Sequence, residues 1–190
     1  MSETAGDGRP ALREALKRTA VALKRSGAPF ALAGGYAAWA RGAPEPSHDV
    51  DFVIAADDAE RVREHLASAG LRVEQPPEDW LFKVYTDDSM VDITYRAVDE
   101  PVTRADLEAA DELEVLSVQM PVLSATELLV HKLMAMDEHT CDFGRQLPVA
   151  RALREQVDWA RVRKETAPSE YAAAFLFLLE RLSIIAPVDA

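Results

Sequence analysis

Residues 49–55 read DVDFVIA, a short apolar segment with two aspartates in its first half. Side chains alternate between the two faces of a β-strand, so Asp49 and Asp51 project to one face while Val50 and Phe52 project to the other. Two neighbouring carboxylates resist joint ionisation unless a cation lies between them. The segment therefore predicts either a solvated strand end or a metal site.

The composition of the 190-residue chain limits the class of protein. A hydrophobic fraction of 48% is ample for one core, with room for a small helical extension. No apolar run approaches the ~20 residues that span a bilayer, and the first residues lack the features of a signal peptide. Cys141 is the only cysteine, which excludes an internal disulfide and a zinc site made of several thiolates. We therefore expect a cytoplasmic protein that does not bind membranes.

The net charge of −12 is unusual for a protein that binds nucleic acid over much of its surface. Basic residues do gather in the segment RALREQVDWARVRK (151–164). That segment predicts either a local basic face for an acceptor or an ordinary solvated helix face.

Hydrophobic periodicity predicts helices and strands in alternation up to about residue 123, and helices alone after it. The expected strands cover residues 29–35, 49–55, 71–75, 80–87 and 89–96, with two more around Met120 and Pro121. Helices are expected at 9–27, 36–42, 57–70 and in several segments from Ser124 onward.

This order of elements predicts an α/β (α+β) fold class. We expect a small mixed β-sheet, with helices mainly on one side, over residues 1–123, and a C-terminal helical bundle over residues 124–190 that completes the site. Ser124 and Glu127 have the spacing of a capping box at the first helix of that bundle.

A third aspartate, Asp92, lies in MVDITY (90–95) with apolar residues on both sides. Burial of this carboxylate costs several kcal/mol unless it is coordinated or hydrogen-bonded. If its strand neighbours that of Asp49 and Asp51, the three carboxylates converge at one edge of the sheet. Such hard oxygen ligands suit Mg²⁺, and a pair of these ions stabilises the attacking and leaving oxygens of phosphoryl transfer. Asp92 would also help to deprotonate an attacking hydroxyl.

The glycine pair Gly34-Gly35 lies between an expected strand and an expected helix. Glycines there let the backbone approach a triphosphate closely, and the hydroxyl of Ser47 can add a contact to a phosphate oxygen. Either a glycine pair or an Asp-x-Asp motif is a weak signal alone. Their order, followed by one buried aspartate in a later strand, is much more specific.

The segments LAGGYAAW, HDVDFVI and MVDITY together resemble the DNA polymerase β-like nucleotidyltransferase superfamily. The resemblance implies a Mg²⁺-dependent enzyme, with a two-ion site, that moves a nucleoside monophosphate from an NTP to a hydroxyl. It also implies that Gly34 and Gly35 bind the triphosphate, and that Asp49, Asp51 and Asp92 bind metal.

The segment PVLSATELLVHKLMAMDEHTCDFGRQL (121–147) resembles AbiEii/MenT-type nucleotidyltransferase toxins. That resemblance implies that Lys132 reaches the nucleotide phosphates and that Asp142 orients it. Lys132 is also a single cation on an apolar helix face, which demands an anion or an exit to solvent. The chain departs from the group at Glu45, where an arginine is usual.

Three functions remain open from the sequence. The first is a toxin of a toxin–antitoxin pair, with an antitoxin protein as partner, that transfers NMP to RNA, notably a tRNA end. The second is an enzyme that modifies a cationic antibiotic such as an aminoglycoside, or a lincosamide. The third is a nucleotidyltransferase-like module that binds a partner without catalysis.

Overall fold

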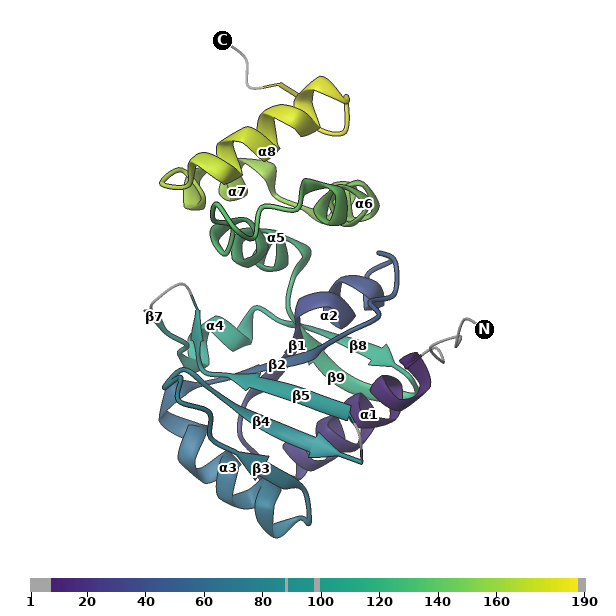
Figure 1. Ribbon diagram of the computed structural model, residues 1–190, viewed down its shortest axis with the longest axis vertical. Coiled ribbons are helices and arrows are strands. Elements are labelled where there is room, and N and C mark those ends of the chain that lie inside the picture. The colour runs from purple at the N-terminus through teal and green to yellow at the C-terminus, as the bar shows by residue number, and fades with distance from the viewer. Residues whose placement is uncertain (1–7, 88, 98–99, 188–190) are drawn as a thin grey trace, which may run out of the picture.

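The computed structural model describes residues 8–87, 89–97 and 100–187. It has two halves: a mixed sheet with its covering helices, and a group of four helices that follows it in the sequence (Figure 1). The helices are α1 (Arg9–Ser26), α2 (Gly34–Ala40), α3 (Ala59–Ser68), α4 (Arg104–Glu108), α5 (Ala125–Met134), α6 (Phe143–Leu153), α7 (Trp159–Glu165) and α8 (Glu170–Arg181), with 3-10 turns at Ala56–Asp58 and Arg154–Gln156. The strands are β1 (Phe30–Ala33), β2 (Val50–Ile54), β3 (Arg72–Glu74), β4 (Leu81–Thr86), β5 (Ser89–Thr94), β6 (Arg96–Ala97), β7 (Glu100–Pro101), β8 (Asp111–Val115) and β9 (Val118–Val122).

The main sheet has seven strands in the order β3-β4-β5-β2-β1-β9-β8. Strand β2 is the middle strand; it pairs antiparallel with β1 and parallel with β5. Strands β6 and β7 form a separate short ribbon. The predicted mixed sheet is confirmed, and its centre is the strand that carries Asp51.

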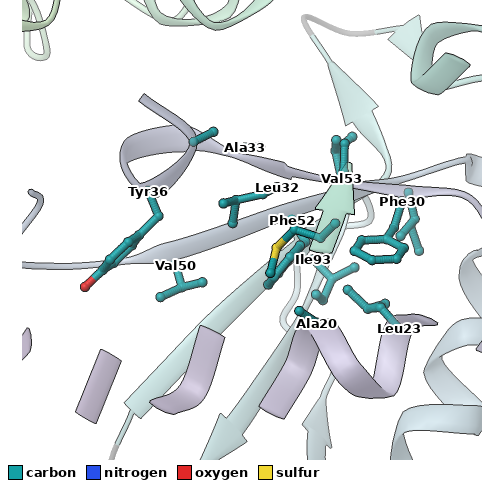
Figure 2. Packing of buried hydrophobic residues seen from close by; sticks show 14 of the residues in the cluster. Ala20, Leu23, Phe30, Leu32, Ala33, Tyr36, Val50, Phe52, Val53 and Ile93 are labelled. Atoms are coloured by element: carbon teal, nitrogen blue, oxygen red, sulfur yellow. The ribbon is translucent and has the colours of Figure 1, made fainter. Parts of the chain in front are cut away.

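Alternation along β2 sorts its side chains between the core and the site. Val50, Phe52 and Ile54 are fully buried. Figure 2 shows Val50 and Phe52 on the side of α1, which contributes Ala20 and Leu23, while Val53 points the other way. Asp51 lies between Val50 and Phe52 in sequence and therefore faces away from α1. The buried apolar residues of β2 hold the strand in the core, and Asp51 lies on the face that α1 does not cover.

Helices lie on both sides of the sheet rather than mainly on one. Helices α1 and α3 cover one face, whereas α2 lies between the sheet and α5 on the other side (Figure 1). Helices α2 and α5 pack against each other, which brings the N-terminus of α2 close to Lys132 in the last turn of α5.

The strand pair after α4 reverses at a different place from the one expected. Leu116 and Ser117 have positive φ values of 52° and 64°, and they form the turn between β8 and β9. Met120 and Pro121 lie inside β9, where they pair with Leu113 and Glu112. Neither turn residue is a glycine or asparagine, so the usual signal of a tight turn is missing.

Side-chain caps begin each of the four C-terminal helices. Ser124, Asp142, Asp158 and Ser169 each accept a hydrogen bond from a backbone N–H three residues on. Such caps stabilise a helix by about 1 kcal/mol each. The Ser124 half of the predicted capping box is therefore present.

Two hydrophobic clusters stabilise the two halves. The larger cluster surrounds α1 and the sheet and includes Leu128 and Leu153 from the helical half. The smaller one lies among α5, α6, α7 and α8 and includes Leu133, Phe175 and Leu179. Among the described residues, no helix combines the length and apolar character needed to cross a bilayer.

Candidate active site

Asp51 lies at the point where β1, β2 and β5 meet. Its Cα pairs with Ala33 of β1 on one side and with Asp92 of β5 on the other. A Cβ added to Gly34 would lie 1.9 Å from Oδ2 of Asp51, and Gly34 has a φ of +59°. Both observations require glycine at position 34, because any side chain there would displace the carboxylate.

The second glycine contacts Asp51 and the next loop. The backbone N–H of Gly35 donates a hydrogen bond to Asp51. A Cβ at Gly35 would lie 3.0 Å from the Cβ of Pro46. The glycine pair thus packs two segments closely: the start of β2 and the loop that precedes it.

The loop before β2 places three polar residues at the edge of the sheet. Ser47, His48 and Asp49 are exposed. Asp49 has a φ of 54°, in the left-handed region that non-glycine residues seldom adopt. Such strain costs about 1–3 kcal/mol and often marks a functional position. The first aspartate of the motif is therefore just outside the strand, and the second is inside it.

The electrostatic environment of Asp51 favours a nearby cation. Burial raises the pKa of its carboxyl to about 6, and the carboxylates of Asp92 and Asp49 push that pKa in the same direction. Lys132 opposes the shift. Burial in turn lowers the pKa of Lys132, against the effect of Asp51. Lys132 thus supplies positive charge beside Asp51, whose ionised form is disfavoured by the carboxylates of Asp92 and Asp49.

Asp92 already has a cationic partner across the sheet. Lys83 of β4 lies opposite it in the register, and Nζ of Lys83 donates to Oδ1 of Asp92 over 3.0 Å. The same ammonium group lies 3.3 Å from Sδ of Met90. Both Lys83 and Asp92 are about a quarter exposed. The pair reaches solvent, so a ligand can compete with it.

The residues fit a divalent cation in donor type and in charge. Asp49, Asp51 and Asp92 supply hard carboxylate oxygens, and burial with two neighbouring carboxylates raises the pKa of Asp51, so a cation bound there would stabilise its ionised form. Within residues 8–87, 89–97 and 100–187, no three His, Cys, Asp or Glu side chains are assembled as a ready metal cage. Mg²⁺ commonly keeps water and substrate phosphates as ligands and needs only one or two carboxylates, so the donor set is suitable.

A cleft of about 410 Å³ opens beside this centre. Its walls come from the glycine pair, the loop before β2, and helices α5 and α6. The lining includes Gly34, Gly35, Ser47, His48, Asp49, Asp51, Lys132, Arg145 and Gln146. Of the predicted site residues, all but Asp92 and Asp142 line this cleft.

Asp142 is placed near Arg145 rather than at Lys132. It caps α6 by accepting a hydrogen bond from the backbone N–H of Arg145, and its carboxylate lies 3.6 Å from Nε of the same arginine. Arg145 lines the cleft, so Asp142 is one step removed from it. In the described residues, the carboxylate that acts on Lys132 is Asp51.

Glu45 lies where an arginine is usual in the toxin group, and it binds an arginine from elsewhere. Nε and Nη2 of Arg13, on α1, donate to its two carboxylate oxygens over 2.7 and 2.5 Å. The ring of Trp39 lies beside the same guanidinium, 5.7 Å away. Burial and Glu45 together raise the pKa of Tyr36 to about 12. This cluster fixes the loop of Ser47 and Asp49 to α1.

A second cavity, of about 530 Å³, lies on the other side of the same centre. It shares Gly34, Asp51 and Lys132 with the cleft. Its other walls carry Trp80, Thr94, Arg96 and His131, with apolar residues between them. Gly34, Asp51 and Lys132 thus lie between the cleft and the second cavity, whose other lining residues differ.

The basic segment 151–164 does not form a free basic face. Arg161 binds Glu127 and Glu165, and Arg163 binds Glu180. Arg154 lies 2.9 Å from Glu155. Two of its five cations, Arg161 and Arg163, therefore join α7 to α5 and α8.

Lys83, Arg13 and Arg145 are site residues that the sequence reasoning missed. Lys83 stands opposite Asp92 only through the β4–β5 register. Arg13 comes from a helix 32 residues before its partner Glu45. An acid at position 45 in place of the usual arginine was the one available signal, since a part-buried carboxylate requires a partner.

Three features meet at this candidate site: carboxylates on adjacent central strands, a glycine pair against one of them, and a cationic helix residue near it. They are the features that the sequence resemblance led us to expect. The family model described as "Uncharacterised nucleotidyltransferase" matches residues 4–186, and the chain belongs to this family. The predicted superfamily is thereby confirmed.

Solved structures share the fold. ANT(2″)-Ia in complex with adenylyl-2″-tobramycin has a TM-score of 0.62 and 16% identity over 88% of this chain and 98% of that chain. The solution structure of the antibiotic-resistance factor ANT(2″)-Ia has a TM-score of 0.58 and 13% identity over 91% and 98%. No curated protein matches the chain significantly.

Proposed function

We propose that this nucleotidyltransferase moves a nucleoside monophosphate from an NTP to an acceptor hydroxyl with release of pyrophosphate. The observation that carries the proposal is the contact of Asp51 with the glycine pair, with Asp92 and Lys132 beside it. The NTP lies in the cleft of about 410 Å³. Gly34, Gly35 and Ser47 contact its triphosphate, and Lys132 and Arg145 neutralise its charge.

Asp49, Asp51 and Asp92 would hold Mg²⁺, with two ions expected. The bound metal would neutralise the triphosphate and polarise the phosphoryl group that is transferred. Asp51 is the central ligand in this proposal, because its raised pKa is lowered again by any cation that binds to it.

The chemical step is a displacement at the α-phosphorus. The acceptor oxygen forms a bond to that phosphorus, while the bond between the α-phosphorus and the bridging oxygen of pyrophosphate breaks. Asp92 takes the proton of the acceptor hydroxyl, and Lys83 holds the Asp92 carboxylate in place. Asp142 acts through Arg145 by fixing the first turn of α6.

RNA, in particular a tRNA end, is the first acceptor that we propose, in a cytoplasmic toxin with an antitoxin partner. The resemblance of residues 121–147 to toxins of this kind supports it. We also propose a division at residue 123: the sheet half supplies the carboxylates, and residues 124–190 supply Lys132 and Arg145.

A cationic antibiotic is the second acceptor candidate. The net charge of −12 favours a polycation over a polyanion at long range. The structural neighbour ANT(2″)-Ia is solved with an adenylylated tobramycin, and its likeness to this chain extends to the fold alone.

A transfer assay tests the proposed reaction. Purified protein, Mg²⁺ and each of four α-labelled NTPs are incubated with total tRNA or with a panel of aminoglycosides and lincosamides. Label on an acceptor, lost in Asp49→Asn and Asp51→Asn, is the expected result; asparagine tolerates the left-handed backbone at position 49. No label with any acceptor would contradict the proposal and favour a binding module. Growth arrest on expression tests the toxin role separately.

A further inference from the structure

The second cavity holds an aromatic side chain that packs in neither hydrophobic cluster. Trp80 is 39% exposed, and in the described residues it is one of the three large apolar side chains left exposed. Tyr36 is fully buried and Trp39 packs against the core, so these two aromatic residues have structural roles. Trp80 is instead available to a ligand.

The backbone around Trp80 is braced. The N–H of Tyr95 donates to the carbonyl of Trp80 over 3.0 Å. The side-chain amide of Gln75 donates to the carbonyls of Glu78 and Leu81, on either side of Trp80. The backbone that carries the indole is therefore fixed at the edge of β4 and needs little ordering when a ring stacks on Trp80.

The charged groups of this cavity are mostly cationic. Among the described residues, the cations Arg96 and Lys132 line it against one carboxyl, Asp51. His131 also lines it, but burial lowers the pKa of its imidazole, which is therefore uncharged at neutral pH. In the part of the chain that the structure describes, Arg96 pairs with the exposed Asp79, at 3.5 Å, and exposed pairs of this kind contribute little. An anionic group can therefore take the place of Asp79. A polycation would meet Arg96 and Lys132 in this cavity, despite the negative charge of the whole chain.

We propose that the second cavity binds the terminal nucleotide of an RNA acceptor, with its base stacked on Trp80 and a backbone phosphate on Arg96. Aromatic stacking with a cationic residue beside it is how proteins hold single-stranded nucleic acid. The cavity ends at Gly34, Asp51 and Lys132, which it shares with the cleft. A terminal hydroxyl in it thus lies next to the carboxylate of Asp51, across from the NTP.

This inference rests on the proposed nucleotidyl transfer, but a binding experiment without NTP tests it separately. A short fluorescent oligoribonucleotide with a free 3′ end is titrated with the full-length protein in the absence of NTP, and anisotropy gives Kd. Trp80→Ala should weaken binding by about tenfold or more, and Trp80→Phe should retain most of it. Arg96→Met should weaken binding and reduce its dependence on salt by about one phosphate contact.

Matched controls come from distant positions of the same kind. Phe177 is 64% exposed on α8, and Arg151 is exposed on α6; Phe177→Ala and Arg151→Met should leave Kd unchanged. Circular dichroism checks that each variant is folded.

The outcomes separate this inference from the proposed reaction. Unchanged Kd in Trp80→Ala and Arg96→Met overturns the acceptor site, and so does transfer of label to tobramycin with no binding of RNA. RNA binding that depends on Trp80, with no transfer under any condition, supports the acceptor site and contradicts the proposed reaction.

Discussion

Gly34 and Asp51 are in such close contact that no side chain fits between them. A Cβ at Gly34 would lie 1.9 Å from Oδ2 of Asp51 and 2.6 Å from its Cγ. The contact crosses from the residue that follows β1 to the start of β2, the central strand of the sheet. The glycine of the motif therefore sets the position of the aspartate of the motif.

Gly34→Ala should abolish transfer, because the new methyl group must displace the Asp51 carboxylate. It should also destabilise the fold by about 1–3 kcal/mol through the left-handed backbone. Gly27 is a matched control, with a φ of +69° and nothing within 4 Å of its added Cβ. Gly27→Ala should show the backbone cost without the loss of activity, as measured by urea denaturation and by the transfer assay. Equal activity of the two variants would contradict the contact.

Asp51→Asn should stabilise the metal-free protein at neutral pH. Burial and two neighbouring carboxylates raise the pKa of Asp51 from 3.8 to about 6. The folded protein then binds the Asp51 proton more tightly than the unfolded chain, so the contribution of this group to stability falls as the pH rises from about 4 to about 6, and is constant above. The difference corresponds to at most about 3 kcal/mol.

Urea denaturation in EDTA at several pH values measures this effect. The free energy of unfolding of Asp51→Asn, relative to that of the wild type, should increase between pH 4 and pH 6. Addition of Mg²⁺ at pH 8 should stabilise the wild type more than the variant. If the difference in unfolding free energy does not change with pH, or if the variant is less stable than the wild type at pH 8, the pKa of Asp51 is not raised in the folded protein.

Lys83→Met should lower kcat by about tenfold or more while the KM for NTP changes little. The physical reason is that Asp92 loses the ammonium group at 3.0 Å that holds it, and a misplaced general base loses much of its effect. Lys83→Arg keeps the charge and should restore most of the rate. A purely structural role predicts equal losses in both variants, and unchanged kcat in Lys83→Met would remove Lys83 from the mechanism.

The Arg13–Glu45 pair should show a measurable coupling energy. A double-mutant cycle with Arg13→Met and Glu45→Gln should give about 1 kcal/mol in stability, because the bond is charge-assisted and bidentate and Glu45 is mostly buried. In the exposed pair Arg63–Glu60 a single nitrogen, Nη2, donates to both carboxylate oxygens, and this pair should give about 0.3–0.5 kcal/mol at most. Glu45→Gln should also raise the KM for NTP. Equal coupling in the two pairs would contradict an anchoring role.

The orientation of Asp51 could be predicted from the sequence because side chains alternate between the two faces of any strand. Period two along DVDFVIA places Asp51 opposite Val50 and Phe52, and the structure has Val50 and Phe52 in the core. The pairing of Asp51 with Asp92 needs one further assumption, that their strands are neighbours, and β2 and β5 are.

The other features of the site and fold depend on tertiary contacts, which local sequence patterns do not predict. Lys83 reaches Asp92 through the β4–β5 register, and Glu45 finds its arginine on α1. The turn at Leu116 and Ser117 has no turn residues to announce it, so tertiary pairing of β9 with β1 and β8 determines it. Trp80 could be separated from the buried aromatic residues only by its exposure.

The most direct test of the central claim is the stoichiometry of a single turnover with Mg²⁺ and an α-labelled NTP. Labelled acceptor and released pyrophosphate are measured together in the wild type, Asp51→Asn and Asp92→Asn. Nucleotidyl transfer predicts one pyrophosphate for each labelled acceptor in the wild type, and neither product in the two variants, which must remain folded. Pyrophosphate or label formed at the wild-type rate by Asp51→Asn would contradict the site described for this protein.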